Sequence, residues 1–235
     1  MSKILQLVSK VIHFKNNFKI FTFYIIRSFK NYFRILINNS INNFFLPNFS
    51  IENVVMINPN KIKYANSIPM KFYKSTKFFV NFDWDKENKL ITEYKHPAYI
   101  TCEELFNKGV EIEKCEEYFY FKKQIHKNNE WKNCKNDNDI VLFLKEKIKL
   151  YESIKKIGVK KNNLSNIQFM IDRNNNLVKI NGGNHRFVIS RILKLKKIPI
   201  EIKIIHSSIL NENLNEKIKI KRINELIKNI ANKYA

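Results

Sequence analysis

The chain has 235 residues, a formal net charge of +22 and a hydrophobic fraction of 44%, which excludes a disordered polypeptide and favours one core with an appendage. Its three cysteines have no metal-ligand spacing, so we expect neither a disulfide framework nor a zinc site, and a reducing compartment is the simpler interpretation. The charge favours anionic partners such as nucleic acid, nucleotides or anionic lipid. An AT-rich genome, which encodes much Lys, Asn, Ile and Phe, is an alternative source of the basicity.

Residues 1–51 carry seven Lys or Arg residues and no Asp or Glu. Apolar residues recur every three to four positions, which predicts a basic amphipathic helical region over 1–45. The region has neither an apolar run that could span a bilayer nor a signal-peptide pattern. Two interpretations stay open. The helix lies on an anionic membrane surface, which places a cytoplasmic protein at the inner face of the membrane, or it packs on the protein's own core or on a partner.

Strand and helix patterns alternate from 46 to 206, and one more helix is expected within 207–235. Val54–Ile57 has the pattern of a short buried strand, which Asn58 and Pro59 end. The further elements expected are a loop and strand (71–84), two helices broken at Gly109 (101–123), an exposed loop (128–139), a helix ended by Gly158 (140–157), a hairpin (166–181), a helix (184–195), a strand (198–205) and a basic helix (211–233).

The stretch KINGGNHRFVIS, residues 179–190, contains two of the four glycines of the chain. It leads from a predicted strand into a predicted helix, whose first N–H groups are free and favour an anion. Cations in the first helical turn oppose the helix dipole unless an anion is bound there. We therefore predict a phosphate site made by Gly182, Gly183, Asn184, His185 and Arg186. The alternative is a tight turn whose histidine and arginine point to solvent or bond neighbouring carbonyls.

The stretch VKINGGNHRFVISRILKLKKIPIEI, residues 178–202, resembles the signature of the ParB/sulfiredoxin-like superfamily. VVMINPNKIKY, residues 54–64, is similar to the opening strand of that domain. The resemblance covers 54–206 and implies an α+β fold, a small mixed sheet with packed helices. In this superfamily sulfiredoxins, ParB partition proteins and free-serine kinases place nucleotide phosphates on the turn. This implies that Gly182 to Arg186 contact ATP or another nucleotide.

A narrower similarity, to a group of ParB-like proteins with an Asp-Trp-Asp motif, is carried by NFDWDKE, residues 81–87. The chain also departs from better-known relatives. Sulfiredoxins need a cysteine where Asn184 stands, so sulfinic acid reduction is not expected. Partition proteins continue with a helix-turn-helix region and a dimerisation segment, whereas the residues after Ile205 are expected to form one helix or two short ones, so chromosome partitioning is not expected. Asn181 replaces the aspartate that many relatives have before the turn.

Asp83 and Asp85 are the predicted catalytic acids, because two carboxylates two residues apart lie on the same side of an extended segment. That spacing suits Mg²⁺, or one acid acting as base on an acceptor hydroxyl. The alternative is a surface turn whose acids are solvated or paired with lysines. His206 is a candidate to face the same site. Arg173 is expected to be exposed, and Cys115 is expected to be a core residue rather than a nucleophile.

Three functions are compatible with these patterns. The first is a nucleotide-dependent phosphotransferase in which Asp83, Asp85 and His185 act in catalysis, with Mg²⁺ held by the two aspartates and a small-molecule or glycan hydroxyl as acceptor. The second is a nucleotide-binding module without turnover. The third is a nucleic-acid-binding protein or ParB-like nuclease that uses the +22 charge, for which no recognition module is found.

Overall fold

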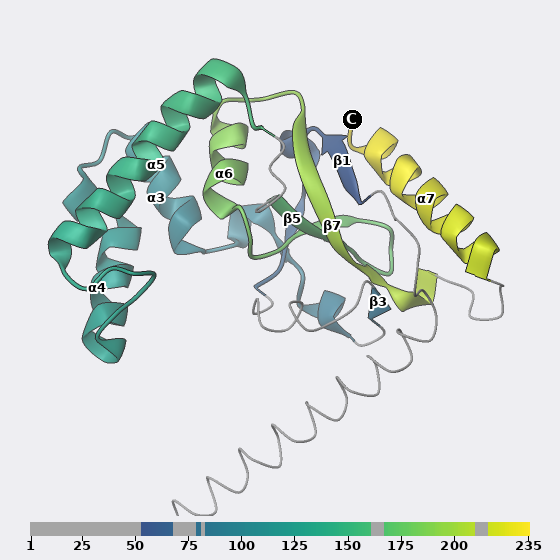
Figure 1. The fold of residues 1–235 in the computed structure, drawn as a ribbon, viewed down its shortest axis with the longest axis horizontal. Helices are drawn as coiled ribbons and strands as arrows, with labels where there is room; N and C mark the ends of the chain where they lie inside the picture. Colours follow the sequence, from purple (N-terminus) through teal and green to yellow (C-terminus); the bar gives the residue numbers. More distant parts are fainter. Residues whose placement is uncertain (1–52, 68–78, 81–82, 161–166, 210–215) are drawn as a thin grey trace, which may run out of the picture.

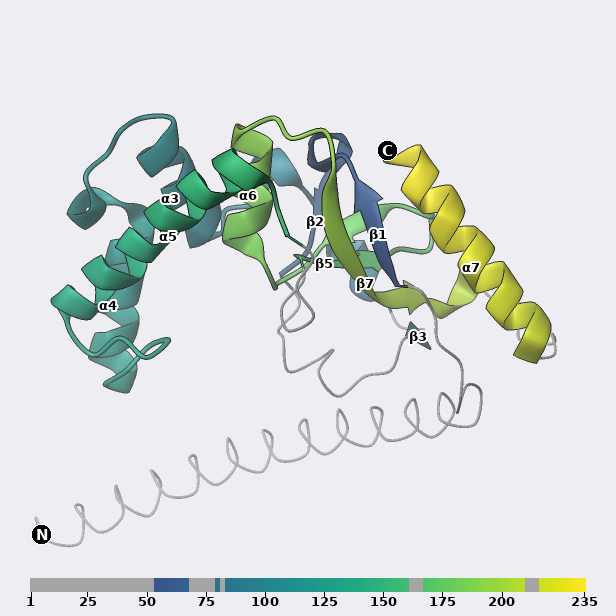
Figure 2. The same cartoon turned by 45° about the horizontal axis from the view of Figure 1, so that its top comes forward.

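The computed structural model describes residues 53–67, 79–80, 83–160, 167–209 and 216–235. In this part the protein is a mixed α+β structure. Helices α3 to α6 lie on one side of a central sheet and α7 lies on the other (Figures 1 and 2). The predicted basic region 1–45 falls outside the described residues.

Seven strands form one mixed sheet in the described residues, in the order β1-β7-β5-β6-β2-β4, with β3 beside β7. The long strand β7 pairs antiparallel with β1 and parallel with β5 and β3, while β6 pairs antiparallel with β5. The strands are β1 (Val54–Ile57), β2 (Tyr64–Ala65), β3 (Phe79–Val80), β4 (Lys89–Leu90), β5 (Ile167–Ile171), β6 (Leu177–Lys179) and β7 (Ile198–His206).

The helices begin and end at recognisable signals. The Asn136 side chain accepts the N–H of Asp139 at 3.0 Å at the start of α5, and Gly158 ends that helix. The α-helices are α3 (Pro97–Phe106), α4 (Glu116–Asn128), α5 (Asp137–Ile157), α6 (Asn184–Ile192) and α7 (Glu216–Lys233); 3₁₀ turns are η1 (Pro59–Lys61), η2 (Trp84–Glu87), η3 (Ile91–Glu93), η4 (Ile112–Lys114) and η5 (Ser207–Ile209).

The main core lies around the sheet and includes side chains from helices on both of its sides. Ile200 and Ile202 of β7, Phe187 of α6 and Ile223 and Ile227 of α7 are all buried in it. A smaller core between α4 and α5 is built around aromatic and aliphatic side chains. The helix predicted within 207–235 is therefore part of the same hydrophobic core as the sheet.

Most predicted elements are confirmed, including β1, the β5–β6 hairpin, the break between α3 and α4, and the Gly158 helix end. Others differ. The helix predicted over 184–195 stops at Ile192, because Lys194 adopts a left-handed backbone (φ +51°). The segment with Asp83 and Asp85 is a 3₁₀ turn rather than extended. Within the described ranges, no helix has the length and apolar character needed to cross a membrane.

Candidate functional site

The Gly-Gly turn between β6 and α6 lies directly against β5. Gly182 and Gly183 have φ angles of +125° and +70°. A Cβ atom on Gly183 would lie 2.9 Å from the Cα of Ile167, and one on Gly182 would lie 2.4 Å from Oε1 of Gln168. Main-chain bonds join the turn to the strand, since the Gln168 N–H donates to the Gly182 carbonyl at 3.2 Å. Gly183 is therefore required by the approach of the turn to the main chain of β5, and Gly182 by its positive φ angle, since the Gln168 side chain can move.

Lys179, at the end of β6, is wholly buried beneath this turn. Its Nζ atom is bonded to the main-chain oxygens of Ile180 and Gly182 and to Oδ1 of Asn184, the last two at 2.8 Å. Three acceptors match the three hydrogens of an ammonium group. Burial, and then the charge of nearby Arg186, lower the pKa of Lys179. Sequence reasoning missed this residue, whose only signal is a lysine inside an apolar strand.

His185, in the first turn of α6, is held by a buried carboxylate. Its Nε2 atom lies 2.7 Å from Oε2 of Glu117, whose side chain is 1% exposed. The N–H of Glu117 donates to the Thr101 hydroxyl at 2.7 Å, which positions the start of α4. Burial alone would raise the pKa of Glu117, but the hydrogen bond and charge of His185, with Lys132, lower it below its ordinary value. The His185 side chain thus points into the protein, toward α4.

Asn184 connects the turn to His96, the residue before α3. Its Nδ2 atom lies 3.1 Å from Nε2 of His96, whose ring stacks on Tyr94. Burial lowers the pKa of His96 to about 4, so this ring is neutral at physiological pH. Two members of the predicted phosphate turn, Asn184 and His185, therefore have His96 and Glu117 as partners, which sequence reasoning missed.

Two further lysines surround Glu117 on the helical side of the site. Lys132 Nζ lies 3.9 Å from Oε1 of Glu117 and 5.1 Å from the ring centre of Phe121. Lys147 Nζ lies 4.0 Å from the ring centre of Phe143, and burial lowers the pKa of Lys147. Phe143 in turn makes an edge contact with His185, with ring centres 6.0 Å apart.

The electrostatic balance of this group is strongly positive. The basic side chains of this group are Lys132, Lys147, Lys179 and Arg186, and burial lowers the pKa of the last three. The carboxylate among the residues described above is Glu117, which lies beside Lys132. Arg186 is half-buried, and burial lowers its pKa. Partly buried cations in excess of their counter-ions are stabilised by a bound anion.

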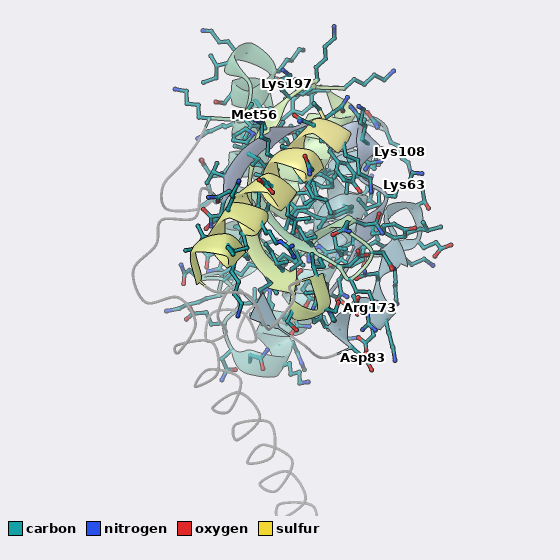
Figure 3. The ribbon with its side chains drawn as sticks, turned by 90° about the vertical axis from the view of Figure 1, so that its right-hand side faces the viewer. Met56, Lys63, Asp83, Lys108, Arg173 and Lys197 are labelled. Atoms are coloured by element: carbon teal, nitrogen blue, oxygen red, sulfur yellow. The ribbon has the colours of Figure 1, made fainter. Side chains whose placement is uncertain are left out.

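Asp83 and Asp85 form a second group with Arg173 of the β5–β6 hairpin turn, and Figure 3 shows Asp83 and Arg173 next to each other. Arg173 binds Asp85 through two bonds, Nη2 to Oδ1 at 2.6 Å and Nε to Oδ2 at 2.7 Å. Its Nη2 also lies 2.7 Å from Oδ1 of Asp83. The prediction that Arg173 is merely exposed is wrong, because its guanidinium joins the two acids to the hairpin.

The environment of the two acids differs. Asp83 is exposed, and hydrogen bonds from Arg173 and Lys86 lower its pKa to about 2. Asp85 is buried, which would raise its pKa, yet the side-chain and main-chain bonds from Arg173 lower it. His206 Nε2 lies 3.9 Å from Oδ1 of Asp85, so the expectation that His206 faces this group is confirmed.

The carboxylates as arranged do not fit Mg²⁺, because Arg173 already binds oxygens of both. Among the described residues no cluster of three or more His, Cys, Asp or Glu side chains could hold a metal ion. The metal site between Asp83 and Asp85 therefore stays a prediction, and no chemical step below passes through it.

The two groups are connected through Asn66 and Tyr94. The Nδ2 atom of Asn66 donates to the Trp84 carbonyl and to Oδ1 of Asn88, both at 2.9 Å. The Tyr94 hydroxyl lies 3.4 Å from the Asn66 carbonyl and 3.5 Å from Oδ1 of Asn181. A continuous polar path thus runs from the segment that carries Asp85 to the residue that precedes the Gly-Gly turn.

Cys115 is buried, and burial raises its pKa to about 11, as expected of a core residue. Comparisons with protein-family models, curated proteins and solved structures found no match. The resemblance to the ParB/sulfiredoxin-like superfamily accordingly stays a prediction.

Proposed function

We propose that the protein is a nucleotide-binding member of the ParB/sulfiredoxin-like superfamily that holds phosphate groups at the Gly-Gly turn. The observation that carries this proposal is the charge of the site. Lys132 lies 3.9 Å from the buried Glu117, which pairs with His185 in the first turn of α6. Lys147 also interacts with Glu117, and Lys179 and Arg186 are two more basic side chains at the same turn. A phosphate group would compensate that excess, and the helix N-terminus favours the same charge.

The residues fit a phosphate group in a specific way. The Phe187 N–H is bonded to the Gly183 carbonyl, so the N–H groups of Asn184, His185 and Arg186 precede the first regular helical bond. The Arg186 guanidinium supplies a planar fork of donors. Lys179 lies below the turn and adds positive charge without itself needing to contact the ligand.

Phosphoryl transfer is the activity that the His185–Glu117 pair favours. A histidine oriented by a buried carboxylate is an arrangement suited to proton transfer. In the proposed reaction His185 accepts the proton of an acceptor hydroxyl while that oxygen attacks the terminal phosphorus and the nucleoside diphosphate leaves. Asp83 and Asp85 would then have a structural role rather than a catalytic one, because Arg173 pairs with both carboxylates.

Isothermal titration of the full chain with ATP, CTP and ADP tests binding. Arg186→Ala should weaken nucleotide affinity about tenfold or more, because a charge-assisted hydrogen bond is lost. The matched control is Arg222→Ala, an exposed arginine on α7 that changes the net charge equally and should leave affinity within about twofold. Equal losses in both variants would show that only overall charge matters.

Turnover is tested separately with labelled ATP and a set of small hydroxyl compounds and glycans. His185→Asn should abolish transfer while nucleotide still binds, which would support the phosphotransferase. Nucleotide binding without transfer by the parent protein would support a non-catalytic module. DNA binding with steep salt dependence, and no nucleotide binding, would instead support the nucleic-acid function. The predicted membrane-surface association rests on residues 1–51, outside the described part of the chain.

A further inference from the structure

We propose that the free edge of β1, together with α7, is a docking groove for an extended acidic segment of a partner protein. This inference is independent of the proposed nucleotide site. It starts from the position of β1, which is the last strand at one end of the sheet in the part of the chain that the structure describes. Exposed strand edges pair readily with another extended chain.

The register of β1 shows which of its main-chain groups are free to pair. The Ile202 N–H donates to the Asn53 carbonyl at 2.8 Å. Bonded and non-bonded positions alternate in an antiparallel pair, so Val55 bonds to β7 while Val54 and Met56 direct their N–H and C=O groups outward. Pro199 lies opposite Met56. Proline has no N–H to donate, which agrees with the non-bonded position that the alternation gives to this pair. Among the described residues these outward groups have no main-chain partner.

A groove of about 900 Å³ runs along this edge, between β1 and α7. Met56, 49% exposed, lies in it, and the half-buried Ala231 of α7 supplies further apolar surface. Figure 3 shows Met56 and Lys197 at the same end of α7. The groove thus combines free main-chain donors and acceptors with a partly apolar wall, which are the two requirements of strand addition.

The charge of the groove indicates which kind of segment would bind in it. The exposed Lys197 and Lys228 line it, and no acidic side chain of the described residues does. Ala235 also lines it, and its main-chain oxygen is bonded to Lys61. Residues 1–51 of this chain carry seven basic residues and no acid, so they do not complement the lysines. A second copy of a chain with net charge +22 would bring the same lysines together. An acidic extended segment complements the lysines and is attracted by the overall charge.

The test uses the full chain and a fluorescein-labelled octapeptide of alternating glutamate and valine, measured by fluorescence polarisation. We expect saturable binding of this peptide and none of a lysine–valine octapeptide. Lys197→Glu combined with Lys228→Glu should weaken binding about tenfold. The matched control combines Lys63→Glu and Lys108→Glu, exposed residues that do not line the groove and lie at the right-hand side of Figure 3, and should change affinity less than about twofold.

Hydrogen exchange followed by NMR tests the strand pairing itself and does not depend on a variant folding. On addition of the acidic peptide, the amides of Val54 and Met56 should exchange more slowly, while that of Val55, already bonded to β7, should not change. Unchanged exchange at Val54 and Met56 would overturn the proposal. So would equal binding of the lysine–valine peptide, displacement of the probe by a synthetic peptide of residues 1–51, or a dimer that the charge reversal dissociates.

Discussion

Replacing Gly183 with alanine should destabilise the protein more than replacing Gly109, although both glycines have a left-handed backbone. Their φ angles are +70° and +65°, so both substitutions carry the conformational cost of about 1–2 kcal/mol for a residue with a Cβ. A Cβ on Gly109 would meet nothing within 4 Å, whereas one on Gly183 would lie 2.9 Å from Cα and 3.1 Å from Cγ1 of Ile167. Relief of that contact requires the turn or β5 to move.

Overpacking of this kind costs about 1–3 kcal/mol more, so the expected totals are about 2–5 kcal/mol for Gly183→Ala and about 1–2 kcal/mol for Gly109→Ala. Urea unfolding followed by circular dichroism measures the difference. With a slope of about 2 kcal/mol per molar urea, the midpoint should fall by about 1–2.5 M in the first variant and by about 0.5–1 M in the second. Coincident midpoints would refute the conclusion that the turn lies against β5.

Three other predictions follow from the charged groups. Arg173→Ala should lower the thermal midpoint at pH 7, because buried Asp85 loses the arginine that binds it through two hydrogen bonds. The lowered pKa of Asp85 stabilises the fold above pH about 4, and this stabilisation is lost as the pH falls through the folded-state pKa. A decrease in the midpoint at pH 3 as large as that at pH 7 would contradict the prediction. Glu117→Gln should tighten nucleotide binding about threefold, because a negative charge near the bound phosphate is removed, and should slow any phosphoryl transfer. Titration measures the first effect and a turnover assay the second. Unchanged affinity would count against a phosphate bound near Glu117. Burial lowers the pKa of Lys179 and a bound phosphate favours its ammonium form, so nucleotide binding should take up protons where Lys179 titrates. Isothermal titration in two buffers of different ionisation enthalpy checks the sign, and proton release would contradict the prediction.

Local patterns predicted most of the described secondary structure. The alternation in IPIEIKII marks β7, and the Asn-rich turn between two apolar runs marks the β5–β6 hairpin. Gly158 ends α5 as expected, because a glycine accepts the left-handed backbone after a helix. These features depend on residues close together in the chain, which is why sequence alone identifies them.

The partners of the site residues could not be predicted in the same way. Arg173 and Asp85 are 88 positions apart, and His185 and Glu117 are 68 apart. Nothing local distinguishes these acids from the other carboxylates of the chain. Only the sheet order, and the packing of α3 and α5 between α4 and α6, bring them together. The Gly-Gly turn was correctly placed between a strand and a helix, but its contact with β5 depends on sheet order.

The position of Lys179 has a consequence for how the turn responds to its surroundings. In some loops a bound sodium or potassium ion gathers the carbonyl oxygens, and such loops change shape when that ion is removed. Here an ammonium group attached to the chain gathers the Ile180 and Gly182 carbonyls and the Asn184 side chain. The turn carries its own monovalent cation, so its shape should be the same in chelator, in potassium and in sodium. Any dependence of ligand affinity on those ions would then arise from the ligand.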